Sequence, residues 1–280
     1  MAAMTDMTGL WAPRSPDRTG FLDRPGARLY WEDAGEGPAV IFAHGLGGNH
    51  LSWWQQVPHF RTRFRCVTFA HRGFAPSGCE GVPDPLAYAG DVAALADHLR
   101  IERFAYVGQS MGGWGGVELA LAEPQRFTAL VLAATSGTFD PKPANPAGFA
   151  DWKTKADATR AYLAERAIHP AVGATLAAAN PALHHLYRAI DALAHGLDKV
   201  ALRAKLMETR KRPLADAAAL KVRTLFVTGS DDIVFPSCCA PGLAAACADA
   251  RHESIDGAGH SAYFDKAAAF NAVVERFLLS

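Results

Sequence analysis

The amino-acid sequence predicts an α/β protein in which a mostly parallel, twisted β-sheet is covered by helices on both faces. Short runs of apolar residues recur along the chain, and such runs are typical of strands buried on both faces. They alternate with helical stretches, which is the pattern of a layered α/β fold. The alternation is interrupted once, by a long segment without a convincing strand between residues 139 and 219.

The predicted strands begin near the N-terminus. Residues 28–33 mix apolar and polar side chains and end at the Gly- and Pro-containing turn 35–38. Residues 39–43 are continuously apolar and lead into the Gly-rich loop 44–48. Further runs of this kind predict strands at residues 65–69, 104–107, 129–133 and 225–228, and a weaker one at 251–255.

Helices are predicted between these strands. Residues 86–99 have an apolar stripe that consists of Leu86, Val92, Leu95 and Leu99. The Gly-rich turn at 108–116 opens a helix that runs to about residue 122. A last amphipathic helix occupies about residues 267–279.

The segment 139–219 is rich in alanine and is interrupted by Pro146, Pro170, Pro181 and Pro213. Because strands flank it and the strand pattern then resumes, we interpret it as a helical lid inserted after the sixth strand. Ordinary helices that cover the sheet are the alternative. The predicted organisation is therefore a core formed by residues 20–138 and 220–280, the lid 139–219, and a flexible leader 1–19.

The composition excludes several classes of protein. Half of the 280 residues are hydrophobic, as in a soluble globular protein, and the 28 Lys and Arg balance the 28 Asp and Glu, which argues against a nucleic-acid binder. No apolar run reaches the roughly 18 residues that a membrane span needs, and no signal-peptide pattern is found, so we expect a cytoplasmic protein. The five cysteines form no CxxC pair, so we expect reduced thiols and no metal.

The strongest local signal is Gly108-Gln109-Ser110-Met111-Gly112, which follows a buried strand and opens a helix. A serine on so tight a turn points its hydroxyl out of the sheet, and the glycines on either side remove side chains that would collide there. The helix N-terminus adds a positive dipole. Ser110 is therefore a candidate nucleophile. The alternative is a Gly-rich turn with an unreactive serine.

A nucleophilic serine needs a base and an acid that orients the base. His260 lies in a Gly-containing loop after the last predicted strand, and Asp231 and Asp232 follow the strand before it. The carboxyl ends of parallel strands meet at one edge of a sheet, and the order serine, acid, histidine is the one expected for such a triad. A surface histidine is the alternative for His260, and the residues alone leave both aspartates open as the acid.

The loop His44-Gly45-Leu46-Gly47-Gly48 supplies the third part of the predicted site. A developing oxyanion needs two fixed N–H donors, and the amides of Leu46 and Met111 are the candidates. A plain turn between strand and helix, or a phosphate cradle, would be alternatives. The loop matches neither GxGxxG nor a P-loop, which argues against phosphate.

Together these loops resemble those of the α/β-hydrolase superfamily, and the resemblance extends over residues 21–280 except the lid, which varies in that family. It implies that Ser110 is the nucleophile, that His260 is the general base, and that Leu46 and Met111 form the oxyanion hole. It also favours Asp232, third after Gly229, over Asp231 as the acid. The Ser-Met-Gly-Gly elbow looks like that of the lactonase, esterase and carbon–carbon-bond hydrolase branch. Haloalkane dehalogenases and epoxide hydrolases have an aspartate at the position of Ser110, so the serine argues against both of these activities.

One loop departs from the family pattern. Residues 70–77 look like the family's Asp-x-Arg-Gly-x-Gly-x-Ser loop, but Ala70 and Ala75 replace the usual Asp and second Gly. Since this loop mainly supports the sheet edge, we expect the fold and the chemistry to survive. Trp53 and Trp114 are candidate pocket-wall residues, with core packing as the alternative for each.

The sequence thus predicts a cofactor-free serine hydrolase that cleaves a carboxylic ester or lactone through an acyl-enzyme. The Ala and Leu content of the lid suggests a small-to-medium apolar substrate. The expected partner is this small molecule, with no nucleic acid and no membrane. A carbon–carbon-bond hydrolase acting on a β-diketone-like ring-cleavage product, or a receptor that kept the fold and lost turnover, are the alternatives.

Overall fold

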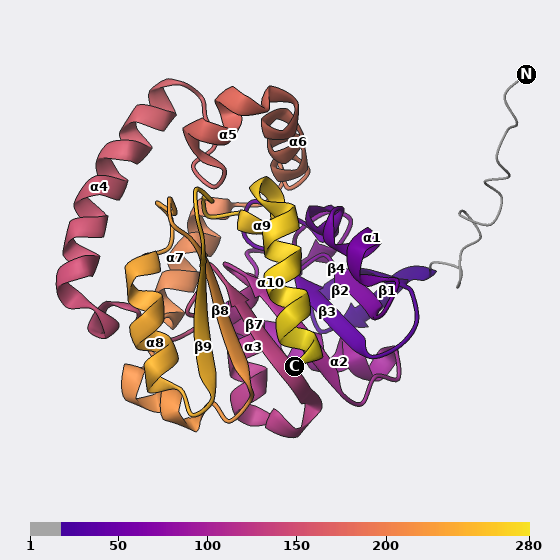
Figure 1. Ribbon diagram of the computed structural model, residues 1–280. Helices are drawn as coiled ribbons and strands as arrows, with labels where there is room; N and C mark the ends of the chain where they lie inside the picture. Colours follow the sequence, from indigo (N-terminus) through magenta and orange to yellow (C-terminus); the bar gives the residue numbers. More distant parts are fainter. Residues whose placement is uncertain (1–17) are drawn as a thin grey trace, which may run out of the picture.

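A computed structural model describes residues 18–280, and within this range the strands form one nine-stranded sheet (Figure 1). The order across the sheet is β1-β2-β4-β3-β6-β7-β8-β9, with β5 paired to β2. The strands are β1 (Arg18–Arg24), β2 (Ala27–Ala34), β3 (Ala39–Ala43), β4 (Arg65–Phe69), β5 (Gly78–Cys79), β6 (Phe104–Gln109), β7 (Phe127–Ala133), β8 (Thr224–Gly229) and β9 (Ala250–Ile255). The predicted leader 1–19 lies mostly outside the described residues.

The sheet is parallel from β4 to β9 and antiparallel only at one edge. β3 pairs in parallel with both β4 and β6, and the parallel pairing continues through β7 and β8 to β9. β2 pairs antiparallel with β1, β4 and β5. The carboxyl ends of the parallel strands therefore meet at one edge, where α/β sheets bind ligands. The predicted mostly parallel sheet is confirmed.

Helices cover both faces of the sheet because successive strand residues point to opposite sides. On one face, Ile41 and Leu130 pack with residues of α2, α3 and α8. On the other face, Phe42 and Val131 pack with residues of α1 and α10. These helices are α1 (Gln56–Phe60), α2 (Tyr88–His98), α3 (Gly112–Ala122), α8 (Ala240–Ala246) and α10 (Ala267–Leu279), with α9 (Ala262–Asp265) just before α10.

The segment between β7 and β8 is helical, and β7 is the sixth strand when the two-residue β5 is left out. Its helices are α4 (Pro146–Glu165), α5 (Gly173–Ala179), α6 (Pro181–Ala192) and α7 (Lys199–Thr209). Pro146 and Pro181 begin α4 and α6, where a missing N–H costs nothing, and Asn145 and Asn180 cap both helices through their side chains. Figure 1 shows α5 and α6 beyond one end of the sheet, whereas the long α4 runs along the side of the molecule.

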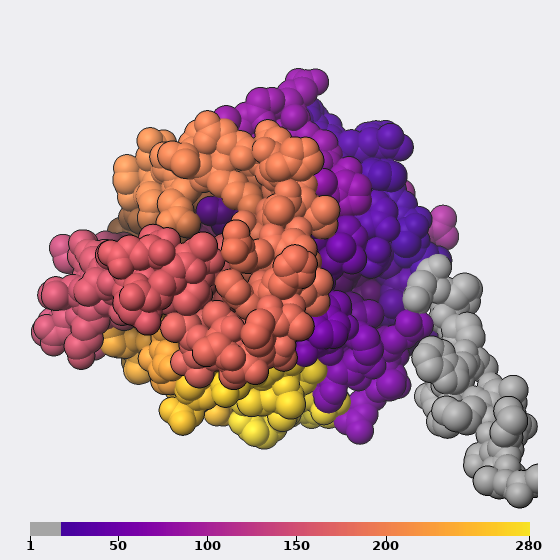
Figure 2. Space-filling view, turned by 90° about the horizontal axis from the view of Figure 1, so that it is seen from above, coloured from indigo at the N-terminus to yellow at the C-terminus, as the bar shows by residue number. Residues whose placement is uncertain are grey.

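The two ends of this helical segment are held together at its base. Phe139 and Arg212 form an isolated parallel bridge, and the Arg212 guanidinium pairs with Glu118 of α3 at 2.7 Å. Seen from above, the segment covers much of the molecule, and a hollow among its orange atoms exposes indigo atoms of the N-terminal region (Figure 2). No helix within residues 18–280 is long and apolar enough to cross a membrane.

The structure adds elements that the sequence did not predict. The core begins at Arg18, because β1 is part of the sheet, whereas residues up to 19 were expected to be leader. β1 is an edge strand of mostly exposed residues and therefore has no apolar run. α1 is a single short turn and therefore has no periodic signal.

Candidate active site

Ser110 lies between β6 and α3 on a sharp turn with a positive φ of 49°. Its amide donates to the Ala133 carbonyl at 2.9 Å, which fixes the turn to the neighbouring strand. A Cβ at Gly112 would collide with the carbonyl oxygen of Ala43, and one at Gly108 would lie 2.8 Å from that of Gly112. The glycines are therefore required by the close approach of helix and strand, as the motif predicts.

His260 and Asp232 lie in the loops after β9 and β8 and form a buried pair. The His260 Nδ1 is 2.9 Å from Asp232 Oδ2, and a carboxylate only accepts, so Nδ1–H is the donor. The other oxygen, Oδ1, accepts from the amides of Val234 at 2.7 Å and Phe235 at 2.9 Å. The exposed side chain of Asp231 instead accepts from Ser230. Of the two aspartates, the structure pairs Asp232 with the histidine.

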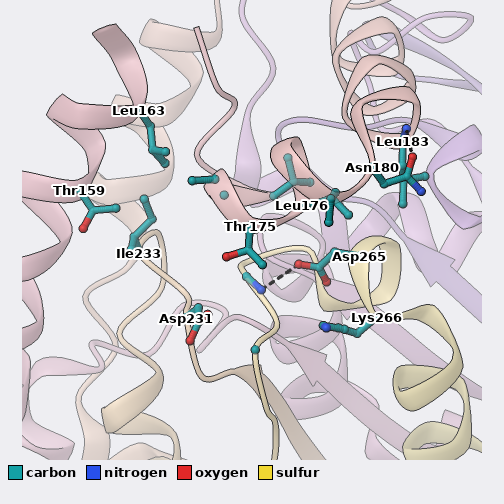
Figure 3. A pocket seen from close by; sticks show the side chains of 16 residues that line it. Thr159, Leu163, Thr175, Leu176, Asn180, Leu183, Asp231, Ile233, Asp265 and Lys266 are labelled. Atoms are coloured by element: carbon teal, nitrogen blue, oxygen red, sulfur yellow. Dashed lines mark hydrogen bonds between the residues drawn. The ribbon is translucent and has the colours of Figure 1, made fainter. Parts of the chain in front are cut away.

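The loop that contains His260 is held from three sides. The side-chain amide of Gln109 donates through Nε2 to the His260 carbonyl at 3.2 Å, which links the loop to the residue before Ser110. The Ser261 hydroxyl donates to Tyr187 of α6 at 3.1 Å. Asp265 accepts from the Gly259 amide at 2.9 Å, the dashed line of Figure 3. Sequence reasoning missed these supports, and only the position of Gln109 inside the elbow motif could have indicated one of them.

The carboxyl group of Asp265 makes stability depend on pH. Burial raises its pKa from 3.8 to about 6, and its Oδ1 is buried without a hydrogen-bond partner. Between these two pH values the folded state keeps a proton that the unfolded state has lost. The free energy of unfolding therefore falls as the pH rises from about 4 to about 6, and it stays at the lower value above that window.

We expect Asp265→Asn to stabilise the protein at pH 7.5 by about 1–2 kcal/mol more than at pH 4.5. The asparagine oxygen still accepts from Gly259, but it carries no buried charge. Denaturant unfolding of both proteins at the two pH values measures this difference, and other titrating groups cancel in the comparison. An equal effect at both pH values would contradict the assignment.

The Gly-rich loop 44–48 lies directly against the turn that contains Ser110. A Cβ at Gly45 would lie 3.0 Å from Ser110 Cβ. The His44 ring accepts from the His71 amide through Nε2 at 2.9 Å, so its Nδ1 donates to the Gly45 carbonyl at 2.8 Å. Burial lowers the pKa of His44 to about 3 and keeps this ring neutral. Within residues 18–280 the amides of Leu46 and Met111 donate to no partner, so both are available to an oxyanion.

A cavity of about 540 Å³ brings the predicted residues together. Ser110, His260, Leu46 and Met111 all line it, together with side chains from α6 and α7. Trp114, a candidate pocket-wall residue, also lines it. Lys199 and Arg203 of α7 and Arg210 directly after it also line the cavity, whereas the Ala and Leu content of the segment suggested an apolar pocket.

Trp53 is not a pocket residue. It is fully buried in the core, with ring centroids 5.2 Å from Phe42 and 4.8 Å from Tyr263, and it does not line the cavity. The prediction is wrong because the 3-10 helix His50–Trp53 turns this side chain inward toward the sheet. Asp231 lines a second cavity of about 430 Å³ between α4, α5 and the loop after β8, with Thr159 and Leu176 (Figure 3).

The loop 70–77 supports the sheet edge in spite of its departures from the family pattern. Arg72 pairs with Asp91 of α2 through two hydrogen bonds of 2.7 and 2.6 Å. The Ser77 hydroxyl donates to the Ala70 carbonyl and accepts from the Tyr30 amide, each at 2.7 Å. The loop is thus anchored without the missing aspartate.

The arrangement combines a partly exposed serine, a buried Asp–His pair and two free amides at the carboxyl edge of a mostly parallel sheet. The model of the alpha/beta hydrolase fold family matches residues 38–267. The chain therefore belongs to the alpha/beta hydrolase fold family.

Individual relatives differ in how much of the chain they match. The "Putative carbamate hydrolase RutD" of Klebsiella pneumoniae is 28% identical over 247 residues, which cover 85% of this chain and 90% of that protein. The protein of the same name from Rhizobium rhizogenes is 35% identical over 123 residues, and the match spans 43% of each chain. The enol-lactonase from Burkholderia xenovorans superposes with a TM-score of 0.73 at 25% identity, covering 93% of this chain and 100% of that chain.

Proposed function

We propose that this protein is a cofactor-free serine hydrolase that cleaves a carboxylic ester or lactone through an acyl-enzyme. The observation that carries the proposal is the shared cavity, which is lined by Ser110, by His260 of the buried Asp–His pair, and by the two residues whose amides are free. Each part matches one requirement of acyl transfer: a nucleophile, a base with a fixed tautomer, and an oxyanion hole. The name of the enol-lactonase relative supports the choice of ester and lactone substrates.

In the first half-reaction, His260 Nε2 takes the proton of Ser110 as Oγ bonds to the carbonyl carbon. The carbonyl electron pair moves onto the oxygen, where the amides of Leu46 and Met111 hold the negative charge. Collapse of this intermediate breaks the bond to the leaving oxygen, which receives the proton from His260. In a lactone, the new hydroxyl stays attached to the acyl group.

In the second half-reaction, His260 removes a proton from water, and the hydroxide attacks the acyl-enzyme carbonyl. The proton returns to Ser110 Oγ as the acid leaves, so the enzyme is regenerated without any cofactor. Asp232 stabilises the imidazolium in both steps and stays ionised. The carboxylate keeps its place through the amides of Val234 and Phe235.

We further propose that the helical segment 139–219 acts as a lid, because α6 and α7 provide much of the cavity wall. The names of the RutD relatives make a carbamate the second candidate substrate, since one of them matches 85% of the chain. An amide-like C–N bond would be cleaved by the same groups, with an amine or ammonia as the leaving group.

A substrate panel tests the proposal. We expect 4-nitrophenyl esters and small lactones to be hydrolysed with a higher kcat/KM than a matched carbamate or a β-diketone-like ring-cleavage product, and to show a burst of the first product. Stopped-flow absorbance and chromatography measure the two quantities. Turnover of the diketone or carbamate alone would replace the proposed substrate class, and binding without any turnover would indicate a receptor.

A further inference from the structure

One face of α7 and the residue that follows it line the candidate active-site cavity with cations. Lys199, Arg203 and Arg210 lie at intervals of four and seven residues, so a helix brings them to one side. Lys199 is neutralised by Asp191, with 2.6 Å between Nζ and Oδ1. Among residues 18–280, neither Arg203 nor Arg210 forms an ion pair. The cavity wall therefore has two positive charges without a counter-ion.

Arg210 is held in place by an aromatic ring, but not all of its N–H groups have a hydrogen-bond acceptor. Its guanidinium carbon lies 4.7 Å from the ring centroid of Trp114, and the Trp114 indole N–H donates to Thr209 at 2.9 Å, which fixes the ring. The Nε of Arg210 is buried and has no hydrogen-bond partner. Asp140 attracts the guanidinium only through space, and no ion pair joins them.

The Arg210 guanidinium remains a cation, and its lack of an ion-pair partner is unfavourable in free energy. Burial lowers the pKa of Arg210 to about 10, so the side chain is still charged at neutral pH. The residue as a whole is only partly buried, but its buried Nε has no hydrogen-bond partner, and an entering anion would offset part of the cost of this arrangement. The planar fork of arginine donors fits a carboxylate through two parallel hydrogen bonds.

The position of Arg210 relates it to the candidate nucleophile. Trp114 belongs to the first turn of α3, four residues after Ser110, and its amide donates to the Met111 carbonyl at 3.1 Å. Arg210 stacks on this tryptophan and lines the same cavity as Ser110. A cavity of about 540 Å³ has the size of a small-molecule site. One ligand can therefore reach both groups.

We propose that Arg210, with Arg203 beside it, forms an anion subsite that binds a carboxylate of the substrate. The inference rests on the proposed function and narrows its substrate class to esters or lactones that contain a free carboxylate. The reacting carbonyl lies at Ser110 and the carboxylate lies at the wall formed by the end of α7. Trp114, Leu206 and Met207 line the same cavity and offer apolar atoms to the rest of the substrate.

Two esters with the same leaving group test the subsite: 4-nitrophenyl hydrogen adipate and 4-nitrophenyl hexanoate. The ratio of their kcat/KM values measures recognition of the carboxylate independently of the chemical step. We expect Arg210→Gln to lower this ratio about 10- to 100-fold, the effect of losing charge-assisted hydrogen bonds. We expect Arg203→Gln to lower it less, because this side chain is more exposed.

Arg166→Gln is the matched control. Arg166 also follows a helix of the segment and stacks on an aromatic ring, with its guanidinium carbon 3.7 Å from the centroid of Tyr162. It pairs with Glu165 and does not line the cavity. The ester ratio should stay at the wild-type value in this variant. An unchanged ratio in both Arg210→Gln and Arg203→Gln would overturn the proposal.

Binding of adipate itself separates this inference from the proposed function. We expect adipate to raise the thermal unfolding midpoint of Ser110→Ala, and to leave that of the Ser110→Ala/Arg210→Gln double variant unchanged. This result supports the subsite even if wild type hydrolyses neither ester, in which case the proposed function alone fails. Equal shifts in the two variants, or no shift in either, would overturn the subsite whatever the turnover.

Discussion

Ser110→Ala is expected to reduce ester turnover by about 10⁶-fold, the order of magnitude found when a triad nucleophile is removed. Without Oγ no acyl-enzyme forms, and only the amides of Leu46 and Met111 remain to stabilise attack by water. Steady-state hydrolysis of a 4-nitrophenyl ester measures the loss. The burst of the first product should disappear as well, because it reports on the acyl-enzyme.

The fold of this variant provides the control. The Ser110 hydroxyl makes no hydrogen bond within residues 18–280, and the turn is held by backbone contacts from Ala133 and Gly113. The free energy of unfolding should therefore change by less than about 0.5 kcal/mol. A folded Ser110→Ala variant that retains wild-type turnover would remove this serine from the mechanism.

Asp232→Asn is expected to lower kcat by about 10⁴-fold. The asparagine has only one acceptor oxygen, and the backbone amides of Val234 and Phe235 hold it at the position that Oδ1 occupies in the aspartate. Its NH₂ group then faces His260 Nδ1, which becomes an acceptor. The proton of the imidazole moves to Nε2, and the ring can no longer take a proton from Ser110. Single-turnover acylation kinetics would show the defect in the first half-reaction.

Asp231→Asn is the matched control for this prediction. The two aspartates are adjacent, but the side chain of Asp231 is exposed and accepts only from Ser230. We expect the control to retain kcat within about threefold, as for a surface substitution away from the chemistry. Similar losses in both variants would mean that the loop as a whole is needed, rather than the buried carboxylate.

Most of the fold could be predicted because its signals are local. The strand at 39–43 and the helix at 267–279 have the predicted bounds, since a buried strand needs an unbroken apolar run and an amphipathic helix needs a stripe. β1 could not be predicted in the same way. It is a half-exposed edge strand that depends on its pairing with β2, and this pairing cannot be recognised from the residues of the strand itself.

The elbow could be predicted from the sequence because the glycines, the serine and the turn are contiguous. The choice between Asp231 and Asp232 could not be made from the residues alone, since the direction of each side chain depends on the turn after β8. Trp53 was misplaced because the direction of its side chain likewise depends on local geometry, here that of the 3-10 helix His50–Trp53. The spacing of Lys199, Arg203 and Arg210 was visible, but the rotation of α7 toward the cavity is set by tertiary packing.

The central claim is that Ser110 becomes the covalent nucleophile, and labelling with a fluorophosphonate tests it most directly. The wild-type protein should gain the mass of one phosphonyl adduct, peptide mapping should locate it on Ser110, and Ser110→Ala should gain none. An unlabelled wild type that still hydrolyses esters, or an adduct on any other residue, would contradict the account.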